Sequence, residues 1–375
     1  MPVGRVQMPD GQLPSELEAP IGRPLGWLRG AAWRPALLWL VVVVAGVLLS
    51  LALIAPFVAL AGADVFQGYQ VLLAQSVGTS YGLTSTLLEA TPLIPVSVGV
   101  AIAYRAGLFN VGGEGQLLWG ALAAVLVGLN VRGVASLPGS YLLPLLVGVV
   151  AGGVWGGIAG YLKAWRGINE IVSTIMLNFV ALYAVQALVS GPLRDPHLDY
   201  NATPEVLSGY RLPILEVGPA IQLGLPISIV VAVVLGCYSE FSRHGIRLRL
   251  VGMDSRLAAR QGVSPRFQWV LALWLAGALA GLGGAVEALG NQYRVGENFS
   301  PGWGFAAIAI ALLARGNLFA VIPVTAYFAA LEAGTSGMGR VLAVPGGIVF
   351  VIQALPLIMV AAIIGINGMR RKAAL

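Results

Sequence analysis

A series of long apolar segments constrains the fold of this chain more than any other feature. A helix needs about 20 mostly apolar residues to cross a bilayer core of about 30 Å. The segments of sufficient length are 36–62, 83–104, 141–162, 171–190, 221–239, 268–289, 318–334 and 346–366, and two shorter ones are 116–130 and 303–314. Hydrophobic residues make up 58% of the chain and charged residues 10%, a balance that few soluble domains could bury. The sequence predicts an all-α membrane protein with about ten transmembrane helices.

The distribution of Lys and Arg predicts the orientation. Cytoplasmic loops of membrane proteins carry an excess of both residues. If all ten segments cross from a cytoplasmic N-terminus, seventeen of the 22 Lys and Arg lie inside and five outside. Omitting one short segment would move one terminus to the wrong side, so we expect ten spans with both termini cytoplasmic. The predicted parts are a disordered cytoplasmic tail 1–35, one transmembrane domain 36–367 with a cytoplasmic loop 240–267, and a basic tail 368–375.

The interval from Phe241 to Trp269 is polar and holds a cluster of arginines. They are Arg243, Arg247, Arg249, Arg256, Arg260 and Arg266. Within it, the string from Asp254 to Gln261 predicts a short helix, because Asp254 is a good N-cap and Gly262 a good stop. A short capped helix below the bilayer is suited to docking another protein.

Three acids lie at apparent membrane depth, where charge is costly and usually faces the protein interior. Glu89 precedes Pro92 and Pro95, which we expect to break the helix and free backbone carbonyls. That context makes Glu89 the best candidate of the three to line a path for a solute or a proton, with a buried hydrogen bond to a neighbouring helix as the alternative. Glu287 and Glu332 lie near predicted outer helix ends, where a buried hydrogen bond is the favoured interpretation.

Polar side chains also gather in two glycine-rich or helix-starting stretches. Asn110, Glu114 and Gln116 stand among four glycines, and amides can offer both donor and acceptor to a neutral polar solute. The alternative is a tight cytoplasmic turn before a helix. Asn169 is placed to cap a helix, and we expect Asn178 within that helix to bond across to a neighbour.

A faint internal repeat relates two parts of the chain. The strings that begin at Arg105 and Val295 each place a glycine-rich stretch, with a Phe and an Asn, before a short apolar segment. In the ten-helix arrangement one enters from inside and the other from outside, so they would be inverted copies. Inverted repeats with short, interrupted helices commonly form the central path of a transporter.

Missing motifs narrow the chemistry. The sequence has no GxxxxGK[ST] phosphate loop, so energy from ATP would have to come from another subunit. The single cysteine, Cys237, and the distant His197 and His244 give no basis for a metal centre, and we expect no cofactor.

The chain resembles the permease subunits of bacterial ABC importers for nucleosides and simple sugars, relatives of the branched-chain amino acid and ribose permeases. The resemblance runs from about residue 80 to 365. The strings that carry it are RAGLFNVGGEGQLLWGA (105–121), GINEIVSTIMLNFVALY (167–183), GIRLRLVGMDSRLAARQGVS (245–264) and SPGWGFAAIAIALLARGN (300–317).

The resemblance implies a type II importer permease fold in the bacterial cytoplasmic membrane. It also implies a non-catalytic subunit that works with a second, related permease, two ATP-binding subunits and an extracytoplasmic solute-binding protein. The 252–262 interval would be the helix that couples to the ATPase, with expected contacts at Gly252, Asp254, Arg256, Ala258, Ala259, Arg260 and Gly262. Many relatives carry a Glu-Asn pair where this chain has Met253 and Asp254, so the detailed contacts differ while the N-cap is kept.

We therefore expect a membrane subunit that imports a nucleoside or purine-like solute. The alternatives are a permease for a simple sugar and, from another class, an ion-coupled secondary transporter. The candidate solute-path residues are Glu89, Asn110, Glu114, Gln116, Asn169 and Asn178. The long outer interval 191–220 would be either a cap that receives an extracytoplasmic partner or a simple connection.

Overall fold

The computed structural model describes residues 64–216 and 220–343, together with a few residues between 52 and 62. The expected span 346–366 and both predicted tails lie outside the described residues, as does most of the span 36–62. The domain boundaries placed there stay predictions.

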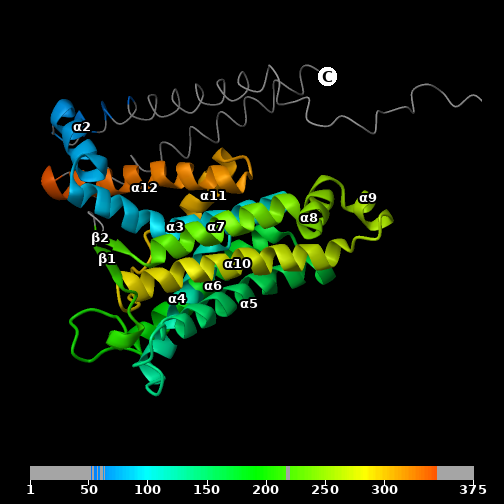
Figure 1. The fold of residues 1–375 in the computed structure, drawn as a ribbon, viewed down its shortest axis with the longest axis horizontal. Coiled ribbons are helices and arrows are strands. Elements are labelled where there is room, and N and C mark those ends of the chain that lie inside the picture. The colour runs from blue at the N-terminus through cyan, green and yellow to red at the C-terminus, as the bar shows by residue number, and fades with distance from the viewer. Residues whose placement is uncertain are drawn as a thin grey trace, which may run out of the picture. The chain divides into compact units, whose positions relative to one another are not determined.

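The described chain is predominantly helical. Its helices are α2 (Val65–Leu73), α3 (Ser80–Arg105), α4 (Gly113–Asn130), α5 (Leu142–Arg166), α6 (Glu170–Ser190), α7 (Gly224–Phe241), α8 (Arg243–Met253), α9 (Ser255–Arg260), α10 (Pro265–Gly290), α11 (Trp303–Leu313) and α12 (Leu318–Val341). Six of the described helices, α3, α5, α6, α7, α10 and α12, are long and apolar enough to cross a membrane. The long helices lie roughly parallel (Figure 1).

A helix lies over each of the eight expected spans from 83–104 to 318–334. The expected short helix after Asp254 is also present as α9. Two helices, α2 and α8, form where the sequence was interpreted as connection. In both, a side chain at the N-cap accepts a backbone N–H: Asp64 from Gln67 at 2.8 Å, and Ser242 from Gly245 at 3.1 Å.

Helix α3 is continuous, so the expected break at Pro92 and Pro95 is wrong. Pro95 has no N–H to donate to the carbonyl of Thr91, four residues earlier. The fully buried Ser228 of α7 replaces that donor, because its hydroxyl donates to the Thr91 carbonyl at 2.9 Å. The freed carbonyl is thus satisfied by a neighbouring helix, which allows the helix to continue.

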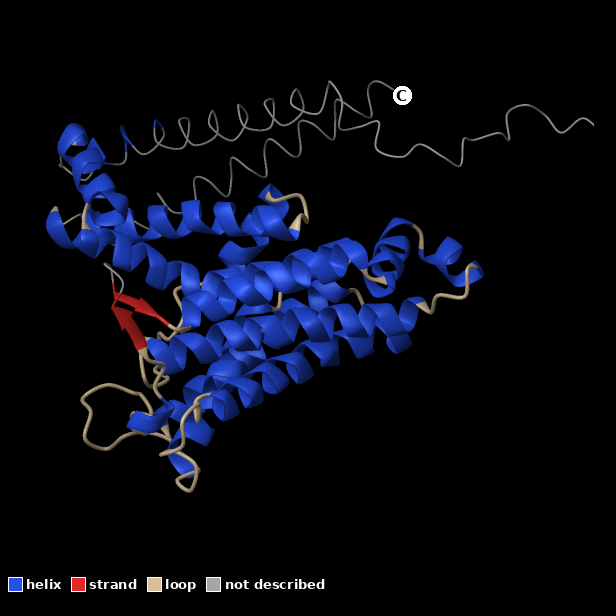
Figure 2. Ribbon diagram, in the orientation of Figure 1, coloured by secondary structure: helices blue, strands red, loops and turns tan. Residues whose placement is uncertain are grey.

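Helices α8 and α9 lie at one end of the bundle, and the long loops lie at the other (Figures 1 and 2). We call these the α8–α9 end and the loop end. The loop end includes the one-turn 3-10 helix η4 (Ser208–Tyr210) and two short antiparallel strands, β1 (Ile214–Glu216) and β2 (Ala220–Gln222), which pair Leu215 with Ile221. The π-helix η3 (Ala74–Gly78) joins α2 to α3.

Glycines bring α10 unusually close to its neighbours α5 and α4. A Cβ atom placed on Gly152 would lie 2.4 Å from the carbonyl oxygen of Gly277. One placed on Gly120 would lie 2.3 Å from the Cα of Gly281. Small residues permit such backbone contact, and helices in lipid associate largely through close packing.

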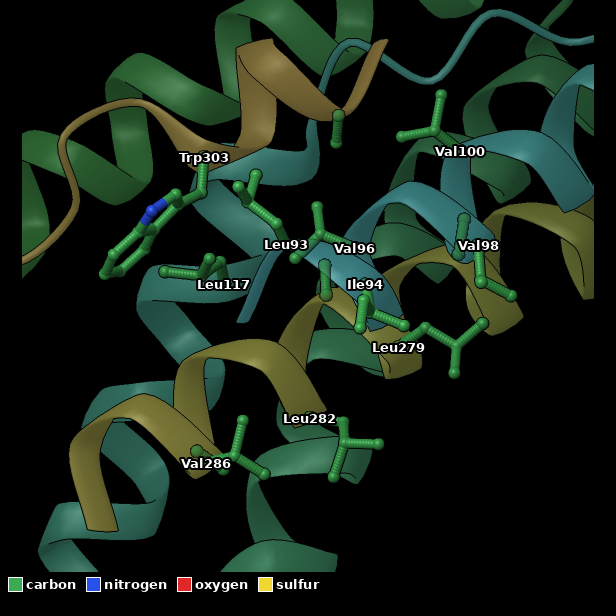
Figure 3. Packing of buried hydrophobic residues seen from close by; sticks show 14 of the residues in the cluster. Leu93, Ile94, Val96, Val98, Val100, Leu117, Leu279, Leu282, Val286 and Trp303 are labelled. Atoms are coloured by element: carbon green, nitrogen blue, oxygen red, sulfur yellow. The ribbon is translucent and has the colours of Figure 1, made fainter. Parts of the chain in front are cut away.

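Helix α3 lies against α10, α11 and α12, and these helices contribute to one core of buried side chains. Figure 3 shows part of that core, with Leu93 of α3, Leu117 of α4, Leu279 of α10 and Trp303 of α11. All four are at most 6% exposed. Helices α4 and α11, of 18 and 11 residues, are therefore internal elements held by the surrounding helices.

Neighbouring glycines of α5 give a matched test of this packing. A Cβ on Gly156 would lie 2.3 Å from the carbonyl oxygen of Leu273, whereas one on Gly157 would meet only the side chain of Trp274, at 3.3 Å. We expect Gly156→Ala to lower the stability of the purified protein by about 1–3 kcal/mol, the usual cost of overpacking. Gly157→Ala should be neutral or slightly stabilising, since alanine favours helix.

Thermal unfolding of both variants in the same detergent checks this expectation. Equal melting temperatures for Gly156→Ala and the unmodified protein would contradict the packing described for α5 and α10.

Candidate functional site

The helical path is interrupted between α3 and α4, inside the bundle. Helix α3 ends at Arg105, and the chain reverses at Gly107, whose φ of +74° favours glycine. Residues 108–112 are not helical, and α4 begins at Gly113 beside Val96. Val96 precedes the end of α3 by nine residues, or about 13 Å along the helix. The start of α4 is therefore well inside the bundle.

A second break lies between α10 and α11. After Gly290 the chain enters a loop and starts α11 at Trp303. Gly304 packs directly on the first turn of α4, because a Cβ placed on it would lie 2.1 Å from the backbone nitrogen of Glu114. Helix α11 then runs toward the α8–α9 end, where Gly316 meets the ring of Tyr104. Helix α4 runs to the loop end, where the backbone carbonyl of Gly128 accepts a hydrogen bond from the N–H of Leu207.

The N-termini of α4 and α11 thus meet in the interior, and an acid contacts each of the first two residues of α11. Glu114 accepts the backbone N–H of Gly304 at 2.8 Å, and Glu89 accepts the indole N–H of Trp303 at 3.0 Å. Helix N-termini carry partial positive charge and unpaired N–H groups, so they favour nearby acids. We call Glu89 and Glu114 the central acid pair.

Two further acids lie near Glu89. The carboxyl groups of Glu287 and Glu332 are both within electrostatic range of it. Glu287 is 1% exposed and accepts hydrogen bonds from Asn291 at 2.7 Å and Gln292 at 3.1 Å. This confirms the interpretation of Glu287 as a buried hydrogen-bonding group at a helix end.

Side-chain amides support the break between α3 and α4. Asn178 of α6 accepts the N–H of Gly115 at 2.9 Å and donates to the carbonyl of Val111 at 2.7 Å. Asn110 and Gln116 form two reciprocal hydrogen bonds, at 2.9 and 3.2 Å. Non-helical backbone at membrane depth requires such internal partners. The expectation that Asn178 bonds across helices is confirmed.

The six candidate path residues therefore fall into three places. Glu89 and Glu114 meet at the start of α11, and Asn110, Gln116 and Asn178 surround the break before α4. Asn169 is separate, because it is exposed and caps α6 by accepting the N–H of Ile171 at 2.9 Å. Contact of any of them with a solute stays a prediction.

The α8–α9 segment is a pair of short helices with well-defined caps. Asp254 caps α9 by accepting the N–H groups of Arg256 at 2.8 Å and Leu257 at 3.1 Å. Ala258 is fully buried in a small cluster with Val251 and Val263. The side chains of α9 therefore divide into an inward face and an exposed one, and Ala259, Arg256 and Arg260 are exposed.

Two hollows flank this segment. One, of about 460 Å³, is lined by Arg243, Ile246, Arg247, Leu250, Leu257, Gln261 and Val263. The other, of about 470 Å³, is lined by Ala106, Gly107, Leu108, Lys163, Val251, Gly252, Met253, Asp254, Ser255, Arg256 and Trp269. The exposed Met253 and the two hollows make the surface at this end uneven.

The loop end is folded into a cap by two segments that are far apart in sequence. Thr203 and Val206 donate backbone hydrogen bonds to Val295 and Tyr293, each at 2.9 Å. Glu205 pairs with Arg211 at 2.5 Å and also with Arg294. We call residues 201–211 with 293–297 the loop cap. Residues 203–211 of the interval 191–220 are thus held in place by tertiary contacts.

One further string, GTSYG at Gly78–Gly82, has the GxSxG spacing of some hydrolases. A nucleophile elbow needs a strand–turn–helix context. Here the string joins η3 to α3, and the hydroxyl of Thr79 caps α3 by accepting the N–H of Gly82 at 3.0 Å. The string is a helix cap.

The comparison with known protein families decides the identity. Residues 82–366 match the family described as the permease component of branched-chain amino acid transport systems. The chain belongs to this family. It is a multi-pass protein of the cytoplasmic (inner) membrane and a permease of the ABC transporter type, as the resemblance in sequence predicted.

Characterised relatives cover most of the chain. A glucose ABC transporter permease of Haloferax volcanii is 35% identical over 78% of this chain and 79% of its own length. A guanosine ABC transporter permease of Bacillus subtilis is 34% identical over 86% of this chain and 93% of its own length. A nucleoside ABC transporter permease of Lactococcus lactis is 29% identical over 91% and 94%. No solved structure gives a significant match.

Sequence reasoning on this permease missed Trp303 and Gly304 as partners of the central acid pair. The signal was present, because both residues belong to the glycine-rich string that forms half of the suspected repeat. Without the fold, nothing indicated that the two halves of the repeat meet at their helix starts.

The ion pairs of Glu205 predict a pH dependence of the loop cap. The hydrogen bond and charge of Arg294, with a smaller contribution from Arg211, lower the pKa of Glu205 below its usual 4.5. A lowered pKa in the folded state stabilises the cap at pH values above 4.5, and this stabilisation is lost as pH falls through the folded-state pKa. Glu205 is largely exposed, so we expect an effect of at most about 1 kcal/mol.

Amide hydrogen exchange over residues 201–211 measures this effect. At pH 7 the Glu205→Gln variant should exchange faster than the unmodified protein, and the difference should shrink at pH values below 4.5. A difference that is independent of pH would refute the role of the carboxylate.

Proposed function

We propose that this permease is the membrane subunit of an ATP-driven importer for a nucleoside or purine-like solute, with a simple sugar as the second candidate. The observation that supports it most is the family match over 82–366 together with relatives named for guanosine and nucleosides over most of the chain. The sugar candidate rests on the relative named for glucose.

The interior supports a solute of this class. The central acid pair provides carboxyl oxygens that can accept hydrogen bonds from hydroxyl or amino groups of a neutral solute. Helices interrupted near mid-bundle are typical of transporter binding sites. We propose that α3–α4 and α10–α11 are the inverted copies suspected from the sequence, because α4 and α11 start together and run to opposite ends.

We propose that the α8–α9 end is cytoplasmic and that α9 docks on an ATP-binding subunit. The charge distribution supports this orientation, since the arginines of α8 and α9 lie at that end. In this assignment the coupling residues are Gly252, Asp254, Arg256, Ala258, Ala259, Arg260 and Gly262. The buried Ala258 and the capping Asp254 would shape the docking helix, and the exposed residues would contact the ATPase.

Further partners follow from the same assignment. A second permease, a related hetero-partner in our proposal, would complete the membrane part, and a solute-binding protein would approach the loop cap from outside. The ten spans with two cytoplasmic termini remain part of this proposal, because the first and last spans lie almost wholly outside the described residues.

An ion-coupled secondary transporter is the competing function, and intramembrane acids such as Glu89 and Glu332 are the observation that favours it. Uptake into liposomes separates the two. We expect no gradient-driven uptake of labelled guanosine by the chain alone, and uptake only with its permease partner, ATPase, binding protein and ATP. Uptake driven by a proton or sodium gradient through the chain alone would overturn the importer proposal.

Ala259→Arg tests the docking role of α9. Ala259 is exposed, so the added side chain should leave the fold intact while it obstructs a closely apposed partner. We expect loss of ATPase co-purification with unchanged membrane insertion. Gly133→Arg is the matched control, because Gly133 lies in an exposed loop at the opposite end with nothing within 4 Å of an added Cβ.

The control variant should retain the ATPase. Equal co-purification of the ATPase with Ala259→Arg and Gly133→Arg would argue against docking on α9.

A further inference from the structure

Arg105, the last residue of α3, binds three groups on two other parts of the bundle. Its Nε donates to the carbonyl of Gly316 at 2.6 Å, just after α11. One Nη donates to the hydroxyl of Ser239 at 2.8 Å, and the other pairs with Glu240 at 2.6 Å. The Arg105 side chain is only 11% exposed, so these contacts are largely shielded from water. The planar guanidinium group, with its fixed donor directions, suits such a junction.

The same junction extends to α8. Glu240 also pairs with Arg249 of α8 at 2.5 Å, so a single carboxylate joins Arg105 to that helix. The backbones meet as well, because a Cβ placed on Gly252 would lie 2.2 Å from the carbonyl oxygen of Arg105. Displacement of α8 by a bound partner would therefore act directly on Arg105.

Helix α11 connects this junction to the interior. It has 11 residues and so a length of about 16 Å. Beyond its C-terminal end, the carbonyl of Gly316 accepts from Arg105, and at its first residues Trp303 and Gly304 donate to Glu89 and Glu114. A short rigid helix held at both ends transmits a displacement from one end to the other.

We propose that Arg105 is the positioning residue through which movement of the α8–α9 segment reaches α11 and the central acid pair. This inference rests on the proposed function, in which an ATPase moves α8 and α9. Arg105 itself contacts neither ATPase nor solute in this mechanism. It keeps α3, α7, α8 and α11 in one arrangement so that ATP-driven movement changes the interior.

The test uses the full complex in liposomes, with the permease partner, the ATPase and the solute-binding protein. The readout is the ratio of ATP hydrolysis with solute-loaded binding protein to basal hydrolysis, measured together with guanosine uptake. We expect Arg105→Gln to keep ATPase co-purification and basal hydrolysis but to lower the ratio and the uptake by about tenfold, within the usual range of allosteric coupling. A residue with only a structural role would lower assembly and both hydrolysis rates together.

Arg166→Gln is the control, because Arg166 is also a helix-terminal arginine near this end but is exposed and forms no ion pair within the described part of the chain. It should retain the full ratio. If Arg105→Gln does not fold, Arg105→Lys is the second test variant. Its single ammonium group keeps the positive charge but cannot reach all three partners of Arg105. A normal ratio and uptake in a folded Arg105 variant would overturn the inference. Failure of the unmodified chain to bind the ATPase would instead refute the proposed function.

Discussion

Backbone hydrogen bonding is the constraint on which the rest of this structure depends. Water is absent from the bilayer core, so a helix can break there only where other protein groups satisfy the exposed N–H and C=O groups. Asn178 does this for the break before α4, and Glu114 does it for the first turn of α11. Ser228 satisfies the carbonyl that Pro95 leaves free in α3. The positions of the short helices follow from these partners.

Close packing at glycines and the meeting of the N-termini of α4 and α11 together determine the arrangement of the interior. Gly120 and Gly152 let α4 and α5 approach α10 so closely that no side chain fits between the backbones. The short helices are then fixed by long ones, and their N-termini face each other in the interior. That arrangement places partial positive charge where Glu89 and Glu114 lie. An interior with these polar groups is consistent with the transport of a hydrogen-bonding solute.

Features that depend on residues close in sequence were predictable, whereas features that depend on contacts with other helices were not. The apolar segments from 83–104 to 318–334 and the capping role of Asp254 depend on residues close in sequence, and the structure shows a helix over each segment and the cap at Asp254. The break at Pro92 and Pro95 was predicted wrongly, because the replacement donor, Ser228, belongs to another helix. Helix α8 was missed because its arginines resemble a basic loop, although Arg249 pairs with Glu240 of α7.

The sequence by itself determined that this is a multi-span membrane protein of the ABC permease type, since apolar length and motif strings are properties of contiguous residues. It also identified Glu89, Asn110, Glu114, Gln116 and Asn178, which lie at the two interior helix starts. Only the tertiary structure decided which of them meet: Glu89 with Trp303, Glu114 with Gly304, and Arg105 with Gly316 and Glu240. These pairs join residues about 135 to 215 positions apart, so packing between helices, rather than local sequence, selects them.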